Sequence, residues 1–166
     1  MEKVSVYVPC YNAGPYLARV IEGLLAQTLR PDEILIVDDG SRDNSLEIAA
    51  RYPVTIVRHE RNRGLAAARN TAFRNARNEL VAALDADCVA QPDWLEKLVA
   101  RLGRENLAGV GGRLIESVQD SLADRWRAQH MPQHWGEAPL VNPRFLFGNN
   151  TIESLSNKDF AGYAVN

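Results

Sequence analysis

Short apolar runs alternate with amphipathic stretches through the first hundred residues of the chain. Runs of strand-forming residues at 4–8, 33–37, 54–57 and 80–84 predict four strands. Between and after them, apolar residues recur at helical spacing, over 17–27, 65–76 and 95–102 among others, and these stretches predict helices. Asn44 with Glu47 resembles a capping box that starts a helix running to residue 51. The pattern therefore predicts four consecutive β-α units.

The predicted strands are apolar on both sides, which favours a parallel sheet covered by helices on both faces. The expected fold class is α/β, with a Rossmann-like, mostly parallel sheet and right-handed crossovers. Beyond residue 103 the pattern loosens into a strand candidate at 110–115, a helix candidate at 122–129 and a short apolar run at 145–148. We expect one domain over residues 1–150. Residues 151–166 show neither a helix face nor a strand with a partner, and form a poorly determined tail.

Composition excludes several classes of protein. The 166 residues include 19 Lys and Arg against 21 Asp and Glu, a net charge of −2, with 46% hydrophobic and 24% charged residues. These values are typical of one globular domain and give no general attraction to nucleic acid, so no nucleic-acid partner is expected. No apolar run approaches the roughly 18 residues of a membrane span, which leaves only peripheral contact with a membrane open.

Location and redox state follow from the N-terminus and the cysteines. The first residues run directly into the first strand without the features of a signal peptide. Cys10 and Cys88 are too few for a disulfide framework. We expect a cytoplasmic location and two free thiols.

Polar clusters follow the predicted strands at the points where they end. Asp38, Asp39 and Gly40 follow the second strand, and Asp85 and Asp87 follow the fourth. Alternate residues of an extended segment face the same way, and paired carboxylates suit hard cations such as Mn²⁺ or Mg²⁺. Each cluster taken alone is better explained as a solvated turn. Because the carboxyl ends of parallel strands meet at one edge, the set favours a site for a nucleoside diphosphate with a metal.

Two further features support such a site. Tyr11, after the first strand, supplies an aromatic ring for stacking, and the turn at Gly64 lets the backbone approach a ligand. Arg61, Arg63 and Arg69 lie before or early in the predicted helix 65–76, where backbone N–H groups also favour anions. One of these arginines reaching a phosphate is the functional interpretation, and a solvated basic face is the alternative.

The segments 4–12, 27–28, 33–43, 62–70 and 84–87, in this order, together resemble family 2 of the inverting glycosyltransferases, which have the GT-A nucleotide-diphospho-sugar transferase fold. The resemblance covers about the first hundred residues. It implies metal-dependent, inverting transfer from a nucleotide-sugar donor, most often a UDP-sugar, to a sugar, lipid or protein acceptor that the sequence does not identify. The implied cofactor is Mn²⁺ or Mg²⁺.

The resemblance also assigns roles to individual positions. It places Pro9, Tyr11 and Asp39 around the base, with Asp39 accepting a hydrogen bond from uracil, and places Gly64 where the chain passes the nucleotide. Asp85 would face the ribose or the metal, and Asp87 would bind the metal on the diphosphate.

One part of the family pattern is missing. Inverting members carry a Glu-Asp pair well after the Asp-x-Asp motif, whose acid acts as general base, and no such pair is present. Asp159 is a weak candidate for the base, and Glu153 is the other acid of the last stretch, but neither lies on a predicted packed element. The alternative function is therefore a nucleotide-sugar-binding module without efficient transfer.

Two other enzyme classes would carry different motifs after the first strand. A sugar nucleotidyltransferase would carry a Gly-rich, Arg-containing loop after the first strand, and a Rossmann oxidoreductase would carry Gly-x-Gly-x-x-Gly there. Neither motif is present.

Overall fold

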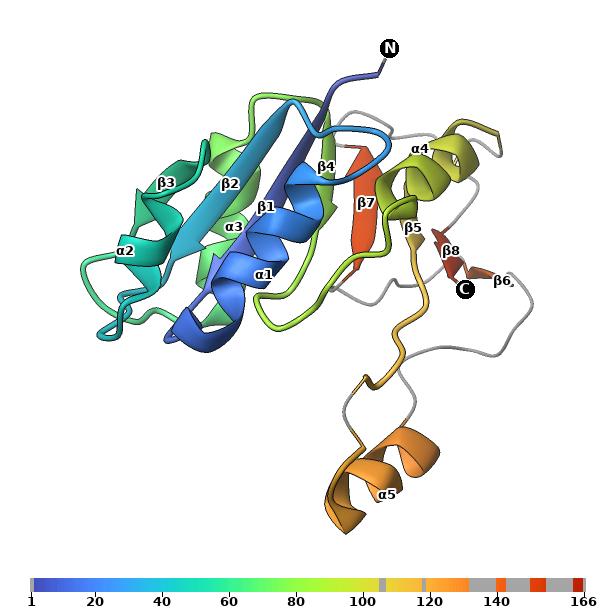
Figure 1. Cartoon of the computed structure of the whole chain (residues 1–166). Coiled ribbons are helices and arrows are strands. Elements are labelled where there is room, and N and C mark those ends of the chain that lie inside the picture. The colour runs from blue at the N-terminus through green and yellow to red at the C-terminus, as the bar shows by residue number, and fades with distance from the viewer. Residues whose placement is uncertain are drawn as a thin grey trace.

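The fold combines a central sheet with helices on both of its faces (Figure 1). The computed structural model describes residues 2–104, 107–117, 119–131, 140–142, 150–154 and 163–165. Its elements follow in the order β1 (Val4–Cys10), α1 (Gly14–Leu25), β2 (Glu33–Asp38), α2 (Ser45–Ala49), β3 (Thr55–Arg58), α3 (Leu65–Asn75), β4 (Leu80–Ala83), α4 (Trp94–Arg104), β5 (Gly109–Gly111), α5 (Leu122–His130), β6 (Leu140–Asn142), β7 (Thr151–Ser154) and β8 (Tyr163–Val165).

Strand order confirms the four predicted β-α units. The described strands form one eight-stranded sheet in the order β3-β2-β1-β4-β7-β5-β8-β6. β1 pairs in parallel with β2 and β4, and β2 pairs in parallel with β3. β7 runs antiparallel to both β4 and β5, β6 runs antiparallel to β8, and β5 and β8 are parallel. The fold class is thus α/β, with a mixed sheet whose first half is wholly parallel.

The core has two layers because β1 and β2 are buried on both faces. On one face, Val6 and Val8 pack with α1 and α4, and this layer is the larger. On the other face, Tyr7 packs against α3, where its ring meets Phe73 edge-on with centroids 5.5 Å apart. The side chains of α3 that face the sheet are alanines at positions 68 and 72, which let the helix approach closely. The sheet is therefore fixed from both sides at its centre.

Pro9 lies inside β1, although the sequence predicts that the strand ends at Val8. Pro9 is in register with Val37, and the carbonyl of Cys10 accepts a hydrogen bond from Asp39 N at 2.8 Å on the β2 side. Because successive residues of a strand bond to alternate sides, Pro9 would direct its missing N–H toward β4, whose pairing with β1 ends at Tyr7. The proline thus removes no ladder hydrogen bond.

The predicted capping box at Asn44 is wrong. Asn44 precedes α2 with φ −81° and ψ 13°, near-helical angles rather than the extended angles of a capping residue, and its side chain makes no cap hydrogen bond. The carboxylate of Asp43 takes this role instead, accepting from Ser45 N at 3.0 Å and from Ser45 Oγ at 2.5 Å.

The sequence predicts no strand after residue 150, but β7 lies between β4 and β5. Ile152 is in register with Ala82 of β4 and Val110 of β5 and is fully buried. The segment has only one large apolar side chain in four residues, and its burial comes from partners far away in the sequence. The first part of the expected tail therefore belongs to the same sheet as β1 to β4.

The structure also tests the elements that the sequence predicts after residue 103. The strand candidate at 110–115 is shorter, as β5, while the helix candidate at 122–129 corresponds to α5. The apolar run at 145–148 lies outside the described residues. None of the described helices is both long and apolar enough to span a bilayer.

A core substitution tests the place of β7. We expect Ile152→Ala to lower the free energy of unfolding by about 2–5 kcal/mol, because it opens a cavity between two strand partners. Ile115→Ala is the control, since the Ile115 side chain is 73% exposed and should change stability by less than about 0.5 kcal/mol. Urea unfolding measures both, and a near-neutral Ile152→Ala would remove β7 from the core.

Candidate functional site

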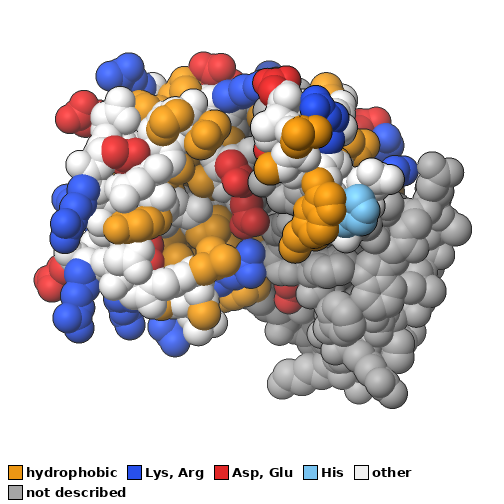
Figure 2. Space-filling model, turned by 90° about the horizontal axis from the view of Figure 1, so that it is seen from below, with side chains coloured by type: hydrophobic (Ala, Val, Ile, Leu, Met, Phe, Trp, Pro, Cys, Tyr) orange, Lys and Arg blue, Asp and Glu red, His pale blue; other side chains and the backbone are white. Residues whose placement is uncertain are grey.

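The polar clusters lie together at the carboxyl edge of the parallel strands. Cys10 is in register with Asp38, and Asp38 with Arg58, so β1, β2 and β3 end side by side. This edge points downward in Figure 1. In the view from below, acidic side chains lie in the middle of the face and basic side chains line one of its margins (Figure 2).

Asp39 is held in place by three hydrogen-bond donors. Oδ1 accepts from Arg63 N at 2.9 Å and lies 2.6 Å from His59 Nδ1, while Oδ2 accepts from Gly64 N at 2.8 Å. Burial alone would raise the pKa of the Asp39 carboxyl, but these bonds outweigh it and hold that pKa below its ordinary value. Asp39 is therefore a fixed, ionised acceptor.

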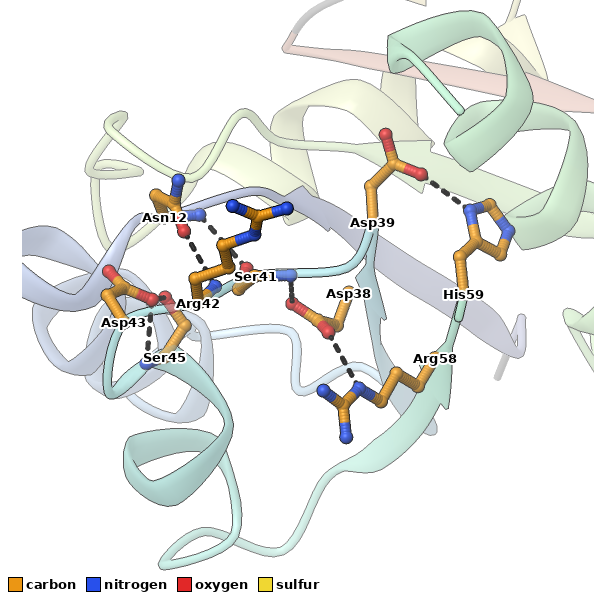
Figure 3. A network of polar contacts seen from close by, with 9 residues as sticks. All are labelled: Asn12, Asp38, Asp39, Ser41, Arg42, Asp43, Ser45, Arg58 and His59. Atoms are coloured by element: carbon orange, nitrogen blue, oxygen red, sulfur yellow. Dashed lines mark hydrogen bonds and ion pairs between the residues drawn. The ribbon is translucent and has the colours of Figure 1, made fainter. Parts of the chain in front are cut away.

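The loops after β1 and β2 are tied to each other through polar side chains (Figure 3). Asn12 has φ 51°, and its Oδ1 accepts from Arg42 N at 2.8 Å, while its own N donates to Ser41 Oγ at 2.9 Å. Asp38 accepts from Ser41 N at 3.2 Å and lies 3.5 Å from Arg58 Nε. These contacts fix the loop that carries Asp39.

A hollow of about 180 Å³ lies beside these loops. It is lined by Tyr11, by residues 40–42 and by residues 58 and 60–62, which include three arginines and one glutamate. Tyr11 is half-exposed, so its ring is accessible to a ligand in the hollow. Gly40 has φ +76°, and a Cβ there would lie 2.6 Å from the Arg61 carbonyl carbon, so only glycine allows the two segments to meet.

Asp85 and Asp87 follow β4 at the same edge. Asp85 is partly buried, and its Oδ1 accepts from Arg69 Nη2 at 3.3 Å. Burial raises the pKa of the Asp85 carboxyl, and the Asp87 charge adds to the rise while Arg69 opposes it. Asp87 is exposed, and its Oδ1 accepts from the Cys88 thiol at 3.5 Å. The two carboxylates are thus open to a further positive charge.

Both cysteines are free thiols, as predicted. Burial, with the charges of Asp87 and Asp85, raises the pKa of the Cys88 thiol to about 12. Burial also raises the pKa of Cys10. Neither thiol is therefore a thiolate near neutral pH.

The first turns of α3 connect the two acidic positions. Gly64, which precedes the helix, donates to Asp39, and Arg69 within the helix donates to Asp85. The sequence predicts one of the local arginines on a phosphate, and in the structure Arg69 lies on a carboxylate of the site. His59 and Thr71 are the residues that sequence reasoning missed, because their contacts with Asp39 and with each other follow no motif spacing.

Of the two predicted candidates for the general base, Glu153 lies among the described residues and Asp159 does not. Glu153 is held by β7, contrary to the expectation that nothing packs beneath it, but it is in register with Val81 inside the sheet. Burial raises the pKa of the Glu153 carboxyl, and Arg69 opposes the rise.

The comparison with protein families decides the classification. Residues 5–162 match glycosyl transferase family 2. The chain belongs to this family. Among the relatives of this family 2 chain, chondroitin synthase from Escherichia coli is 38% identical over 56% of the chain, and the uncharacterized glycosyltransferase EpsJ from Bacillus subtilis is 37% identical over 70%. The chain covers only 14% and 35% of the lengths of these two proteins.

Solved structures agree with the GT-A fold. The S. aureus TarS fragment in complex with UDP aligns with a TM-score of 0.73 at 23% identity, covering 92% of this family 2 chain and 46% of TarS. The mannosyltransferase PcManGT from Pyrobaculum calidifontis, in complex with GDP-Man and Mn²⁺, aligns with a TM-score of 0.62 at 31% identity. That alignment covers 66% of the chain and 34% of PcManGT.

The conformation of Gly64 is open to a direct test. Gly64 has φ 88° and ψ 160°, a region occupied almost only by glycine, and no described atom lies within 4 Å of a Cβ built there. We expect Gly64→Ala to lower the free energy of unfolding by about 1–3 kcal/mol through backbone strain alone.

Gly103→Ala is the matched control. A Cβ at Gly103 also meets no described atom, but the residue is in α4, where alanine is favoured over glycine by about 1 kcal/mol. Thermal unfolding should therefore separate the two variants in opposite directions. Equal effects would contradict the proposed strain at Gly64.

Proposed function

We propose that this chain binds a nucleotide-sugar donor, in the first place a UDP-sugar, for inverting transfer of the sugar to an acceptor. The observation that carries the proposal is that Asp39 and Asp85 lie at the same carboxyl edge of the parallel strands. Gly64, just before α3, donates to Asp39, and Arg69 of α3 donates to Asp85. Tyr11 and the hollow beside it would receive the base. The family resemblance adds Pro9 as a further residue around the base and Gly64 where the chain passes the nucleotide. The acceptor, whether sugar, lipid or protein, is open.

Asp85 and Asp87 would hold Mn²⁺ or Mg²⁺. Their oxygens are the ligands that hard cations prefer, and the raised pKa of the Asp85 carboxyl, which burial causes, supports a role for a cation beside it. Among the described residues, no cluster of three or more His, Cys, Asp or Glu forms a closed metal site. Diphosphate oxygens and water would complete the shell, which suits a metal that binds together with the donor. The metal would neutralise charge on the leaving diphosphate.

Known relatives support a nucleotide-sugar donor. TarS has been crystallised with UDP and with UDP-GlcNAc, and PcManGT with GDP-Man and Mn²⁺. The family 2 membership supports the transfer reaction. We also propose a cytoplasmic location, which the two free thiols support.

A second function is a nucleotide-sugar-binding module that transfers poorly. It is favoured by the position of Glu153, which lies in register with Val81 rather than at the strand edge. A general base must lie within about 2.6–3.2 Å of the acceptor hydroxyl, or one water away, and a missing base costs about 10²–10⁴-fold in rate.

Metal-dependent binding tests the donor site. We expect calorimetry to show UDP binding in the presence of Mn²⁺, and EDTA or Asp87→Ala to weaken it at least about tenfold, because the diphosphate loses its counter-charge. Asp120→Ala, which removes an exposed acid before α5, is the control and should bind as the unaltered chain does. UDP affinity that is indifferent to EDTA and to Asp87→Ala would contradict the metal site.

Turnover then separates the two functions. Release of UDP from UDP-sugars is followed with and without a panel of sugar, lipid and protein acceptors. Acceptor-dependent release supports the transferase, whereas binding with only slow hydrolysis supports the module. A chain that binds no nucleoside diphosphate with Mn²⁺ would refute both.

A further inference from the structure

We propose that His59 is a positioning residue that orients Asp39 to select bases presenting a ring N–H, such as uracil and guanine, over cytosine and adenine. The inference rests on the proposed function, since it needs a nucleotide at this edge. It concerns a histidine that the family resemblance did not single out.

His59 is buried and anchored on three sides. Its backbone N donates to the carbonyl of Asp38 at 2.8 Å, directly after β3. Nδ1 lies 2.6 Å from Asp39 Oδ1, and Nε2 lies 2.8 Å from Thr71 Oγ1 on α3. The ring, with 6% of the residue exposed, therefore cannot turn without breaking both side-chain contacts.

The charge on Asp39 decides which partner donates in the hydrogen bond between His59 Nδ1 and Asp39 Oδ1. Hydrogen bonds hold the pKa of this carboxyl below its ordinary value, so near neutral pH the group is ionised and can only accept. Nδ1 must then carry the proton and donate. Thr71 can donate to Nε2 or accept from it, and either arrangement fixes the ring in the same position.

His59 and the backbone together divide the acceptor capacity of Asp39. Oδ1 takes two donors, His59 Nδ1 and Arg63 N, while among the described residues Oδ2 takes only Gly64 N. A carboxylate oxygen accepts about two hydrogen bonds. Oδ2 therefore keeps acceptor capacity for one further donor, which has to reach a residue that is 3% exposed. The bond from His59 holds Oδ1 at the ring and leaves Oδ2 as the oxygen with this capacity.

This arrangement discriminates between bases by their edges. Uracil offers N3–H and guanine offers N1–H, both of which can donate to Oδ2. Cytosine N3 and adenine N1 present a lone pair, which a carboxylate repels. UDP against CDP, and GDP against ADP, therefore compare the same ring size with the ring N–H either present or replaced by a lone pair.

Three variants separate the roles of the two ring nitrogens. His59→Leu removes both polar contacts at similar volume. In His59→Asn, the side-chain nitrogen can occupy the place of Nδ1, so this variant keeps the donor to Asp39 and loses the contact with Thr71. Thr71→Val removes only the outer contact and leaves His59 in place.

Calorimetry with Mn²⁺ measures the affinity ratio UDP/CDP and the ratio GDP/ADP for each variant. Both affinities in a ratio are measured on the same protein preparation, so the ratio does not depend on the fraction of folded protein. A variant that only unfolds part of the protein therefore leaves the ratio unchanged. The test uses whichever of UDP and GDP the unaltered chain binds more tightly, together with its partner in the ratio. For that ratio we expect His59→Leu to cause a fall of at least about tenfold, because the base loses a hydrogen bond to a charged group. His59→Asn and Thr71→Val both keep the donor to Asp39 and lose only the contact between residues 59 and 71, so both should stay within about twofold of the unaltered chain.

Unchanged ratios in His59→Leu would overturn the inference and make the Asp39–His59 pair only a clamp on the loop. If His59→Leu does not fold, His59→Phe, which also lacks both ring nitrogens, takes its place, and an unchanged ratio in that variant has the same meaning. Failure of the proposed function looks different, because the unaltered chain would then bind none of the four nucleotides.

Discussion

The register of β1 with its two parallel neighbours is the constraint on which the rest of the structure depends. β1 is buried along its whole length and pairs with β2 through Cys10 and with β4 through Tyr7. Parallel pairing brings the carboxyl ends to one edge, so the residues that follow each strand become neighbours although they are tens of residues apart. A slip of one residue would turn Tyr7 and Val8 to the opposite faces and separate the acids from their partners.

Burial disfavours the charged form of a carboxylate, so Asp39 and Asp85 need hydrogen bonds or positive charges to offset it. The two residues obtain them in different ways. Asp39 receives three donors, and the pKa of its carboxyl falls. Asp85 receives one arginine, which does not offset burial, and the pKa of its carboxyl rises. The same helix, α3, contributes to both. The edge thus contains one carboxylate whose charge is balanced by hydrogen bonds and one that a cation would stabilise further.

Local patterns predicted the first half of the molecule, and non-local pairing decided the second. The apolar runs of β1 to β4 and the periodicity of α1 are visible in short windows of sequence, and the strand-end rule then located Asp39 and Asp85. β7 was missed because the burial of Ile152 depends on Ala82 and Val110. The contacts of His59 were missed for a similar reason, since histidine, aspartate and threonine at these separations form no motif. Asn44 was misassigned because the neighbouring Asp43 is the stronger acceptor.

The central position of β7 has a consequence for synthesis of the chain. Glu79 beside β4 and Ser154 at the end of β7 are joined by a hydrogen bond across 75 residues of sequence. A nascent chain that has already assembled β1 to β4 on the ribosome therefore holds an unpaired β4 edge until residue 154 has emerged. Such an edge can join other chains, and it makes chaperone protection during translation most valuable in this interval. Strand β7 thus covers the free edge of β4 late in synthesis, although it lies near the middle of the finished sheet.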